Sequence, residues 1–241
     1  MSKETSTSET WFHILKASAK IPGAKIDREQ FLRKEFAEFC DEVKINELVA
    51  TDPAKARIHI ETLDQIAEKC IQVETMQASA ISFAAGLPGG WWMAATIPAD
   101  VSQFYYRAMI LAQKLAYIYG WPDLFENTDV LSDEASLRLT LFMGVMMGSG
   151  GAVTTLNGIA KGLAHQAVKS MPQLVLNNII NQIAKWIGVK ITKVSFTKGI
   201  AHVIPLIGGI FSAGLSAGMM LPMAKKLKKY LRNSPIITEA L

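Results

Sequence analysis

Three long stretches of the chain contain no aspartate, glutamate, lysine or arginine, and each is interrupted near its middle by glycine or proline. They lie between Glu74 and Asp100, between Arg138 and Lys161, and between Lys198 and Lys225. A bilayer-spanning helix needs about 20 mostly apolar residues, so each stretch is long enough for one. The interruptions leave runs of about 10–14 residues, a length typical of a buried helix or a re-entrant hairpin.

The interruptions predict helical hairpins instead of continuous membrane spans. The expected turn residues are Pro88, Gly89, Gly90, Gly150, Gly151, Pro205, Gly208 and Gly209. In lipid, such a break leaves backbone N–H and C=O groups unpaired unless protein or water covers them. Small residues four apart, such as Gly144 and Gly148, form a flat strip against which a second helix packs closely. We therefore expect small-residue hairpins that contact a membrane without crossing it, although a soluble helical core uses the same strips.

Capping residues predict where the first helices begin. Asp27, with Gln30 three residues later, forms a capping box that satisfies free N–H groups at a helix start. Asp52 followed by Pro53 predicts a second start, with aspartate as the N-cap and proline at the first helical position. Apolar residues at three- to four-residue spacing follow both signals, as expected for helices with one buried face.

Later helices complete the predicted fold. One helix is expected over residues 98–119 and ends at Gly120. Ser132 is expected to cap another, and residues 174–187 place apolar side chains on one side of a third. Only residues 191–196 weakly resemble a strand. The pattern predicts an all-α fold: a single helical bundle with glycine- and proline-broken hydrophobic hairpins.

Composition places the chain between soluble and polytopic membrane proteins. Half of its residues are hydrophobic and 19% are charged, compared with about a quarter charged in soluble domains. From Lys161 onward there are eleven basic residues and one acidic residue, Glu239. This asymmetry favours an anionic surface as partner, and acidic lipid headgroups fit beside an apolar stretch. Nucleic acid is not expected, because no basic stripe is interleaved with stacking aromatics.

The ends of the chain and its cysteines suggest one cytoplasmic domain. We expect residues 1–12 to be a disordered N-terminal tail, residues 13–234 the helical domain and residues 235–241 a C-terminal tail. The polar opening MSKETSTSET lacks the basic region and apolar run of a signal peptide. Cys40 and Cys70 lack metal-ligand spacing, which fits two thiols in a reducing compartment.

Three segments carry a resemblance to a known family. The first, AGLPGGWWMAATIPADVSQFYYRAMILAQKLAYIYGWPDL (residues 85–124), combines a glycine-proline-glycine turn, a Pro-Ala-Asp helix start and a helix closing on Ala-Tyr-x-Tyr-Gly. The second, HVIPLIGGIFSAGLSAGMM (residues 202–220), places an Ile-Pro-x-x-Gly-Gly turn before a small-residue helix. The third is PGAKIDREQFLRKEF (residues 22–36). The first two look like the signatures of the EcsC family, and the third resembles the start of one subgroup.

The resemblance implies a bacterial, helical protein. The EcsC family is named for a gene next to a transporter of the ATP-binding-cassette type that is linked to protein secretion. No enzymatic activity or cofactor is established for the family, so no catalytic residue carries over to this chain. The implied partner is a membrane transporter or a secretion component.

Asp100, Gln103 and Arg107 share one side of the helix predicted over residues 98–119. If this side faces a pocket, the three would bind a polar ligand such as a headgroup, with Arg107 as the anion partner. Two other interpretations stay open: a solvated helix face, and a buried Asp–Arg pair between helices.

A second group of residues is expected to contact membrane or lipid: Trp91, Trp92, Lys225, Lys226, Lys228, Lys229 and Arg232. Tryptophan rings favour the bilayer interface. The basic residues directly follow an uncharged stretch, where each contributes about 1 kcal/mol near an anionic surface. The other interpretations are core packing for the tryptophans and a solvated helix for the basic run.

No motif predicts catalysis, a metal or a cofactor. Ser149 lacks the G-x-S-x-G pattern, because Met147 stands at the first glycine position. We expect a non-enzymatic helical protein that is peripherally or shallowly associated with the inner membrane of a bacterium and regulates or scaffolds a transporter or secretion component. The alternatives are a soluble bundle that binds an apolar or lipid ligand, and a pore-forming effector. The oligomeric state is left open.

Overall fold

The computed structural model describes residues 11–12, 15–16, 18–85, 99–125, 131–163, 172–186 and 213–240. Every regular element in these ranges is a helix, which confirms the all-α prediction. The elements are α2 (Arg28–Phe36), α3 (Glu42–Ala50), α4 (Ile60–Ala85), α5 (Ala99–Ile118), α6 (Asp133–Met146), α7 (Gly150–Gly158), the π-helix η2 (Ile159–Leu163), α9 (Gln173–Trp186), α11 (Ala213–Arg232) and α12 (Pro235–Thr238). The weak strand candidate at residues 191–196 lies outside the described residues.

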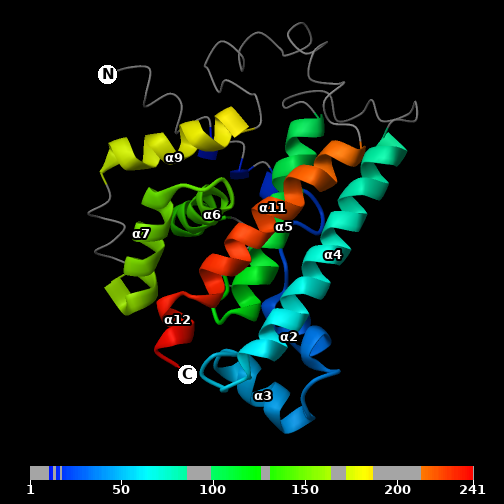
Figure 1. The fold of residues 1–241 in the computed structure, drawn as a ribbon, viewed down its shortest axis with the longest axis vertical. Helices are drawn as coiled ribbons and strands as arrows, with labels where there is room; N and C mark the ends of the chain where they lie inside the picture. The colour runs from blue at the N-terminus through cyan, green and yellow to red at the C-terminus, as the bar shows by residue number, and fades with distance from the viewer. Residues whose placement is uncertain are drawn as a thin grey trace, which may run out of the picture.

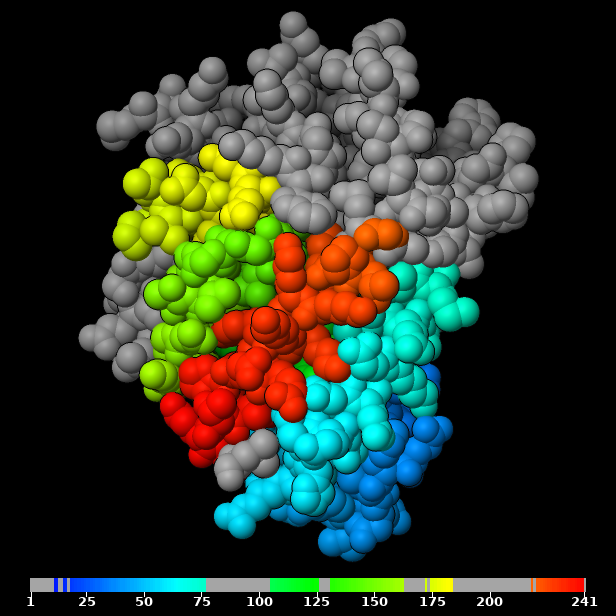
Figure 2. Space-filling view, viewed as in Figure 1, coloured from blue at the N-terminus to red at the C-terminus, as the bar shows by residue number. Residues whose placement is uncertain are grey.

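Helix α11 occupies the middle of the described bundle. It packs against α4, α5 and α6 (Figure 1). The space-filling view shows α11 between α4 and the α6–α7 pair (Figure 2). Helix α2 packs on α5, and α9 packs on α6 from the side away from α4. The long helices α4, α5 and α11 therefore form the frame to which the shorter helices are attached.

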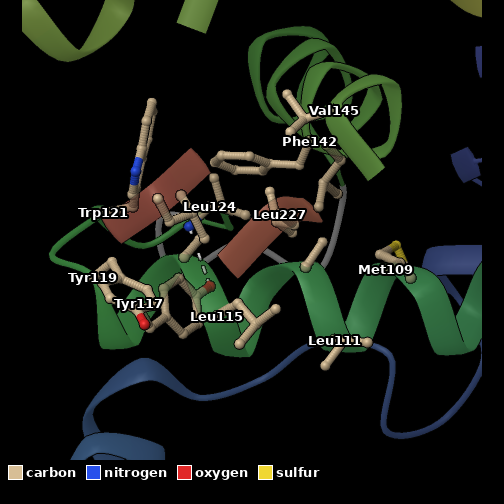
Figure 3. Packing of buried hydrophobic residues seen from close by; sticks show 14 of the residues in the cluster. Met109, Leu111, Leu115, Tyr117, Tyr119, Trp121, Leu124, Phe142, Val145 and Leu227 are labelled. Atoms are coloured by element: carbon tan, nitrogen blue, oxygen red, sulfur yellow. Dashed lines mark hydrogen bonds between the residues drawn. The ribbon is translucent and has the colours of Figure 1, made fainter. Parts of the chain in front are cut away.

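The core is a single apolar cluster to which α5, α6 and α11 all contribute. Trp121, which follows α5, meets Phe142 of α6 edge-on, with ring centroids 4.9 Å apart, and Leu227 of α11 lies close by (Figure 3). At the edge of this cluster the Tyr117 hydroxyl accepts a hydrogen bond from the Leu124 N–H, 3.3 Å away. Large rings thus fill the space between three helices, as dense core packing requires.

Capping side chains start two helices where the sequence predicts them. The Asp27 carboxylate accepts a hydrogen bond from the Gln30 N–H at 2.9 Å, directly before α2. The Ser132 hydroxyl accepts one from the Ala135 N–H at 3.1 Å, directly before α6. The helices predicted over residues 98–119 and 174–187 are also present, as α5 and α9.

The prediction that a helix begins at Asp52-Pro53 is wrong, because α4 begins at Ile60. Asp52 does accept a hydrogen bond from the Lys55 N–H at 2.8 Å. Only one turn forms, however, before Arg57 adopts a φ of 52°. A positive φ interrupts the helical backbone and is uncommon for a residue other than glycine. The alanine side chains of this turn are buried, so packing against the core holds it in place.

Parts of both predicted tails belong to the folded core. Trp11, within the predicted tail 1–12, is fully buried, and its indole N–H donates a hydrogen bond to the Thr140 hydroxyl at 2.8 Å. Ile237, within the predicted tail 235–241, is buried in α12. Trp11 and Ile237 therefore belong to the described core, although the sequence places both in tails.

Candidate functional site

The central uncharged stretch forms a helical hairpin, as predicted, but its turn lies earlier than expected. Helix α6 ends at Met146, Gly148 adopts a φ of 87°, and Ser149 is the N-cap of α7. Glycine adopts this left-handed conformation at little cost, whereas a residue with a side chain does not. Gly150 and Gly151, which were expected at the turn, instead lie in the first turn of α7.

This hairpin is packed inside the protein through its small residues. A Cβ atom at Gly144 would lie 2.7 Å from the Ile179 Cγ2 of α9 and 2.9 Å from the Ala152 Cβ of α7. Glycine therefore lets two helices approach α6 at one point. Helix α6 is buried from Leu139 to Met146. The small residues of this stretch therefore serve as packing sites in a helical core. None of the described helices is long and apolar enough to span a bilayer.

Much of the other two uncharged stretches lies outside the described residues. That part includes Trp91, Trp92 and the predicted turn residues Pro88, Gly89, Gly90, Pro205, Gly208 and Gly209. The helices on either side are described. The C-terminal ends of α4 and α9 and the N-terminal ends of α5 and α11 all lie at one end of the long axis, at the top of Figure 1. Both stretches are therefore joined to the same end of the bundle.

Two residues of the basic C-terminal run form ion pairs with α4. Lys228 Nζ lies 2.8 Å from Glu68 Oε1, and Arg232 Nε lies 2.7 Å from Asp64 Oδ2. The Tyr119 hydroxyl donates a further hydrogen bond to Asp64 at 2.6 Å. Burial raises the pKa of Asp64, but these hydrogen bonds and the charge of Lys228 outweigh burial and hold the pKa below its ordinary value. The pairs attach α11 to α4.

The other three basic residues of the run, Lys225, Lys226 and Lys229, are exposed on α11. Leu221, one turn before Lys225, is the exposed apolar side chain on the same face. The predicted five-residue basic site is thus divided: three lysines are exposed, and Lys228 and Arg232 form ion pairs with α4, although the Arg232 side chain is 43% exposed.

Arg107, predicted to bind an anion, faces a carboxylate of the protein itself. Its Nη1 lies 3.5 Å from Glu74 Oε2, and Lys114 also pairs with Glu74. The Glu74 side chain is only 4% exposed, so these groups form a buried charge cluster between α4 and α5. A buried pair between helices was one interpretation of the sequence, but the acid is Glu74 and not Asp100. The side chains of Asp100 and Gln103 lie outside the described set.

A cavity of about 640 Å³ opens between the end of α3, the loop after α5, η2 and α12. Its charged lining residues are Arg28, Asp52, Lys55, Asp123, Arg138 and Glu239. The Arg28 guanidinium donates to three backbone carbonyls, those of Val49 and Thr51 at 3.2 Å and that of Trp121 at 3.4 Å. Burial lowers the pKa of Arg28, and the charge of Asp52 opposes this effect. Arg28 therefore joins the C-terminal end of α3 to the loop after α5.

Sequence reasoning missed both the cavity and the Glu74 cluster. The cavity is lined by segments far apart in the chain, so no local pattern marks it. The cluster does leave a signal, because Arg107 and Lys114 are seven residues apart and therefore share one face of α5. Two cations on the inner side of a helix call for a carboxylate from a neighbouring helix. Within the described ranges, no three His, Cys, Asp or Glu side chains gather as metal ligands would.

Comparisons of this chain with protein-family models, with curated proteins and with solved structures found no match. The similarity to the EcsC family therefore rests on the sequence signatures alone.

Proposed function

We propose that this chain is a non-enzymatic helical protein that attaches peripherally to an anionic membrane through one end of its bundle. The observation that carries the proposal is the shared position of the four helix ends to which the two uncharged stretches are joined (Figure 1). Uncharged runs of about 10–14 residues suit shallow insertion better than a complete span. This end of the bundle is therefore connected to most of the apolar sequence that lies outside the described core.

Exposed apolar side chains on the described helices support the same orientation. Met76 is 71% exposed in the C-terminal half of α4, and Leu174 is 62% exposed on α9, which lies across the top of the bundle in Figure 1. A large contiguous apolar patch often marks a protein or membrane contact, whereas Met76 and Leu174 are two separate exposed side chains on different helices. These two residues extend the apolar character of the chain onto helices next to the proposed contact.

The exposed lysines Lys225, Lys226 and Lys229 supply the electrostatic part of the proposal. Near an anionic bilayer each lysine contributes about 1 kcal/mol, and this contribution decreases within a Debye length of the surface. Because Lys228 and Arg232 are bound to α4, attraction to lipid depends on three lysines instead of five cations. The apolar stretches then have to supply most of the binding free energy.

The resemblance to the EcsC family extends the proposal to a partner. On this view the protein lies on the cytoplasmic face of the inner membrane of a bacterium, where it regulates or scaffolds a transporter or secretion component. Attachment through one end of the bundle leaves α2, α3 and the cavity beside α12 facing away from the lipid.

Co-sedimentation with lipid vesicles tests the membrane contact directly. The full chain is mixed with vesicles of phosphatidylglycerol and phosphatidylcholine, and with vesicles of phosphatidylcholine alone. We expect it to sediment with the anionic vesicles. The double variant Trp91→Ser/Trp92→Ser is expected to lose most of this binding. Lys225→Glu/Lys229→Glu is expected to reduce it several-fold at low salt and less at high salt, because salt screens surface charge.

The matched control is Lys20→Glu/Lys34→Glu, which changes the net charge equally at two exposed lysines on the N-terminal part. If this control loses as much binding as Lys225→Glu/Lys229→Glu, the attraction is a general charge effect and α11 is not its site. If the unmodified chain stays in the supernatant with both kinds of vesicle, the membrane proposal is wrong. A lipid that co-purifies with such a chain would then favour the ligand-binding alternative.

A further inference from the structure

The cavity beside α12 has an unequal balance of hydrogen-bond donors and acceptors. Two of its carboxylates already have partners. Asp52 pairs with Lys55 Nζ at 3.0 Å and also accepts the Lys55 N–H. Asp123 accepts hydrogen bonds from the Tyr117 hydroxyl and the Phe125 N–H, both at 3.0 Å. The acceptor side of the cavity is therefore largely satisfied by the protein itself.

The donor side is not satisfied in the same way. Trp121 is 1% exposed, and its Nε1 has no hydrogen-bond partner among the described residues. Arg138 pairs with Glu134 through one terminal nitrogen, while its buried Nε likewise lacks a partner in the described part of the chain. Both residues line the cavity. A buried donor without an acceptor is unfavourable, so the site is suited to a group that brings acceptors.

The remaining walls are apolar and are built from short elements. Ile159 and Ala160 of η2 lie on one side, with Pro235 and Ile236 of α12 also in the lining. The backbone of η2 is not helical at Gly162, where φ is 77°. The two nitrogens that lack partners are covered by neighbouring side chains, so these side chains have to move before a ligand reaches the nitrogens. Short elements adjust in this way more readily than long helices do.

We propose that this cavity binds a small amphipathic molecule that carries one oxyanion, either a carboxylate or a phosphate. The oxyanion accepts hydrogen bonds from Arg138 and Trp121, and the apolar part lies against Ile159, Pro235 and Ile236. A cavity of about 640 Å³ is within the roughly 300–1,000 Å³ range of small-molecule sites and is larger than a bare ion needs. The site is separate from the apolar part of the proposed membrane contact, which is at the end of the bundle where α11 begins, whereas Lys225, Lys226 and Lys229 are in the C-terminal half of α11.

Calorimetric titration with ligands of equal chain length tests the charge preference. Hexanoate, hexyl phosphate, hexan-1-ol and hexylammonium are each added to the full chain at neutral pH. We expect one hexanoate or one hexyl phosphate per chain, bound about tenfold or more tightly than the alcohol or the amine. The tighter of the two anions identifies whether the natural ligand is a carboxylic acid or a phosphate ester. Equal binding of all four compounds, or binding of none, would overturn the proposal.

Two variants locate the binding in the cavity. Arg138→Gln should weaken hexanoate binding about tenfold, whereas the matched control Arg33→Gln should leave it unchanged. Arg33 forms the same kind of i,i+4 pair, with Glu29, away from the cavity. Glu134→Gln should tighten binding, because the Glu134 carboxylate competes for the Arg138 guanidinium and is 52% exposed, so the fold tolerates the change. Unchanged affinity in both cavity variants would contradict the proposal.

A third variant fills the space without changing charge. Ala50 is exposed and lines the cavity at the end of α3, so Ala50→Phe should exclude hexanoate. Ala37→Phe adds the same ring at an exposed alanine outside the lining and should bind as the unmodified chain does. If Ala50→Phe binds hexanoate with unchanged affinity, the ligand occupies another place on the protein.

Discussion

Helices α4 and α6 lie on opposite sides of α11 and contact their neighbours by contrasting means. Helix α4 uses charged side chains: Glu74 pairs with two cations of α5, while Asp64 and Glu68 pair with two cations of α11. Helix α6 is buried from Leu139 to Met146 without a charge and approaches α7 and α9 at Gly144. Helix α4 adds directed ion pairs to a buried apolar face that includes Leu63, Ile66 and Ile71, whereas α6 relies on close packing of its surface.

The contrast changes the meaning of two sequence features that suggest a membrane. The glycine-broken stretch between Arg138 and Lys161 forms α6 and α7 and packs in the core. Two cations of the basic run, Lys228 and Arg232, pair with α4 and hold α11 against it. Both features therefore have a use inside the protein. The proposed membrane attachment then depends on the two uncharged stretches that are joined to one end of the bundle and on three exposed lysines.

The largest expected effect is at Glu74. Glu74→Ala should lower the free energy of unfolding by about 3 kcal/mol, because it removes the buried carboxylate with which Arg107 and Lys114 pair. Urea denaturation followed by circular dichroism measures the loss. The control is Glu68→Ala on the same helix, where the acid is 42% exposed and its loss should cost under about 1 kcal/mol. Equal losses would show that burial does not distinguish the two ion-pair clusters of α4.

An intermediate effect is expected at Gly144. Gly144→Ala places a Cβ 2.7 Å from the Ile179 Cγ2 and 2.9 Å from the Ala152 Cβ, so the packing of α9 and α7 on α6 has to adjust. The free energy of unfolding should fall by about 1–2 kcal/mol through overpacking, despite the higher helix propensity of alanine. Gly150→Ala is the matched control, since a Cβ there meets nothing within 4 Å. That variant should be neutral or stabilising by up to about 1 kcal/mol. The opposite order of stabilities would contradict a packing role for Gly144.

The smallest expected effect depends on pH and involves Asp64. Because the folded-state pKa of Asp64 lies below its ordinary value, ionised Asp64 contributes stability above that ordinary value, near pH 4. This contribution is lost as the pH falls through the folded-state pKa. Asp64→Asn should cost under about 1 kcal/mol at pH 7, and the difference from the unmodified chain should shrink between pH 4 and pH 2. A difference that stays constant with pH would mean that the Asp64 charge does not hold α11.

Local signals predicted the parts of the fold that depend on neighbouring residues. Asp27 and Ser132 start α2 and α6 because a capping side chain bonds an N–H group three residues later. The same kind of signal failed at Asp52, where one turn forms and Arg57 then leaves the helical region. That turn is packed against the core, and its neighbours come from distant segments. Tertiary contacts therefore determine the backbone conformation of this turn, and the local sequence does not reveal those contacts.

Pairing between helices was beyond local reasoning for the same reason. Asp64 and Glu68 are four residues apart, as are Lys228 and Arg232, so each pair occupies one face of its own helix. The two patterns are complementary. Recognising them as partners requires knowing that α4 lies beside α11, which only the fold reveals. The cavity lining has the same origin, because the end of α3, the loop after α5, η2 and α12 meet there.

The contact between α4 and α11 also sets the order in which the chain becomes compact. Glu68 and Lys228 are 160 positions apart, and a ribosome adds roughly 5–20 residues per second, so about ten to thirty seconds separate their synthesis. During this interval the face of α4 that later meets α11 has no native partner. Nascent chains are therefore exposed to chaperones and to mispairing until α11 arrives and closes the bundle.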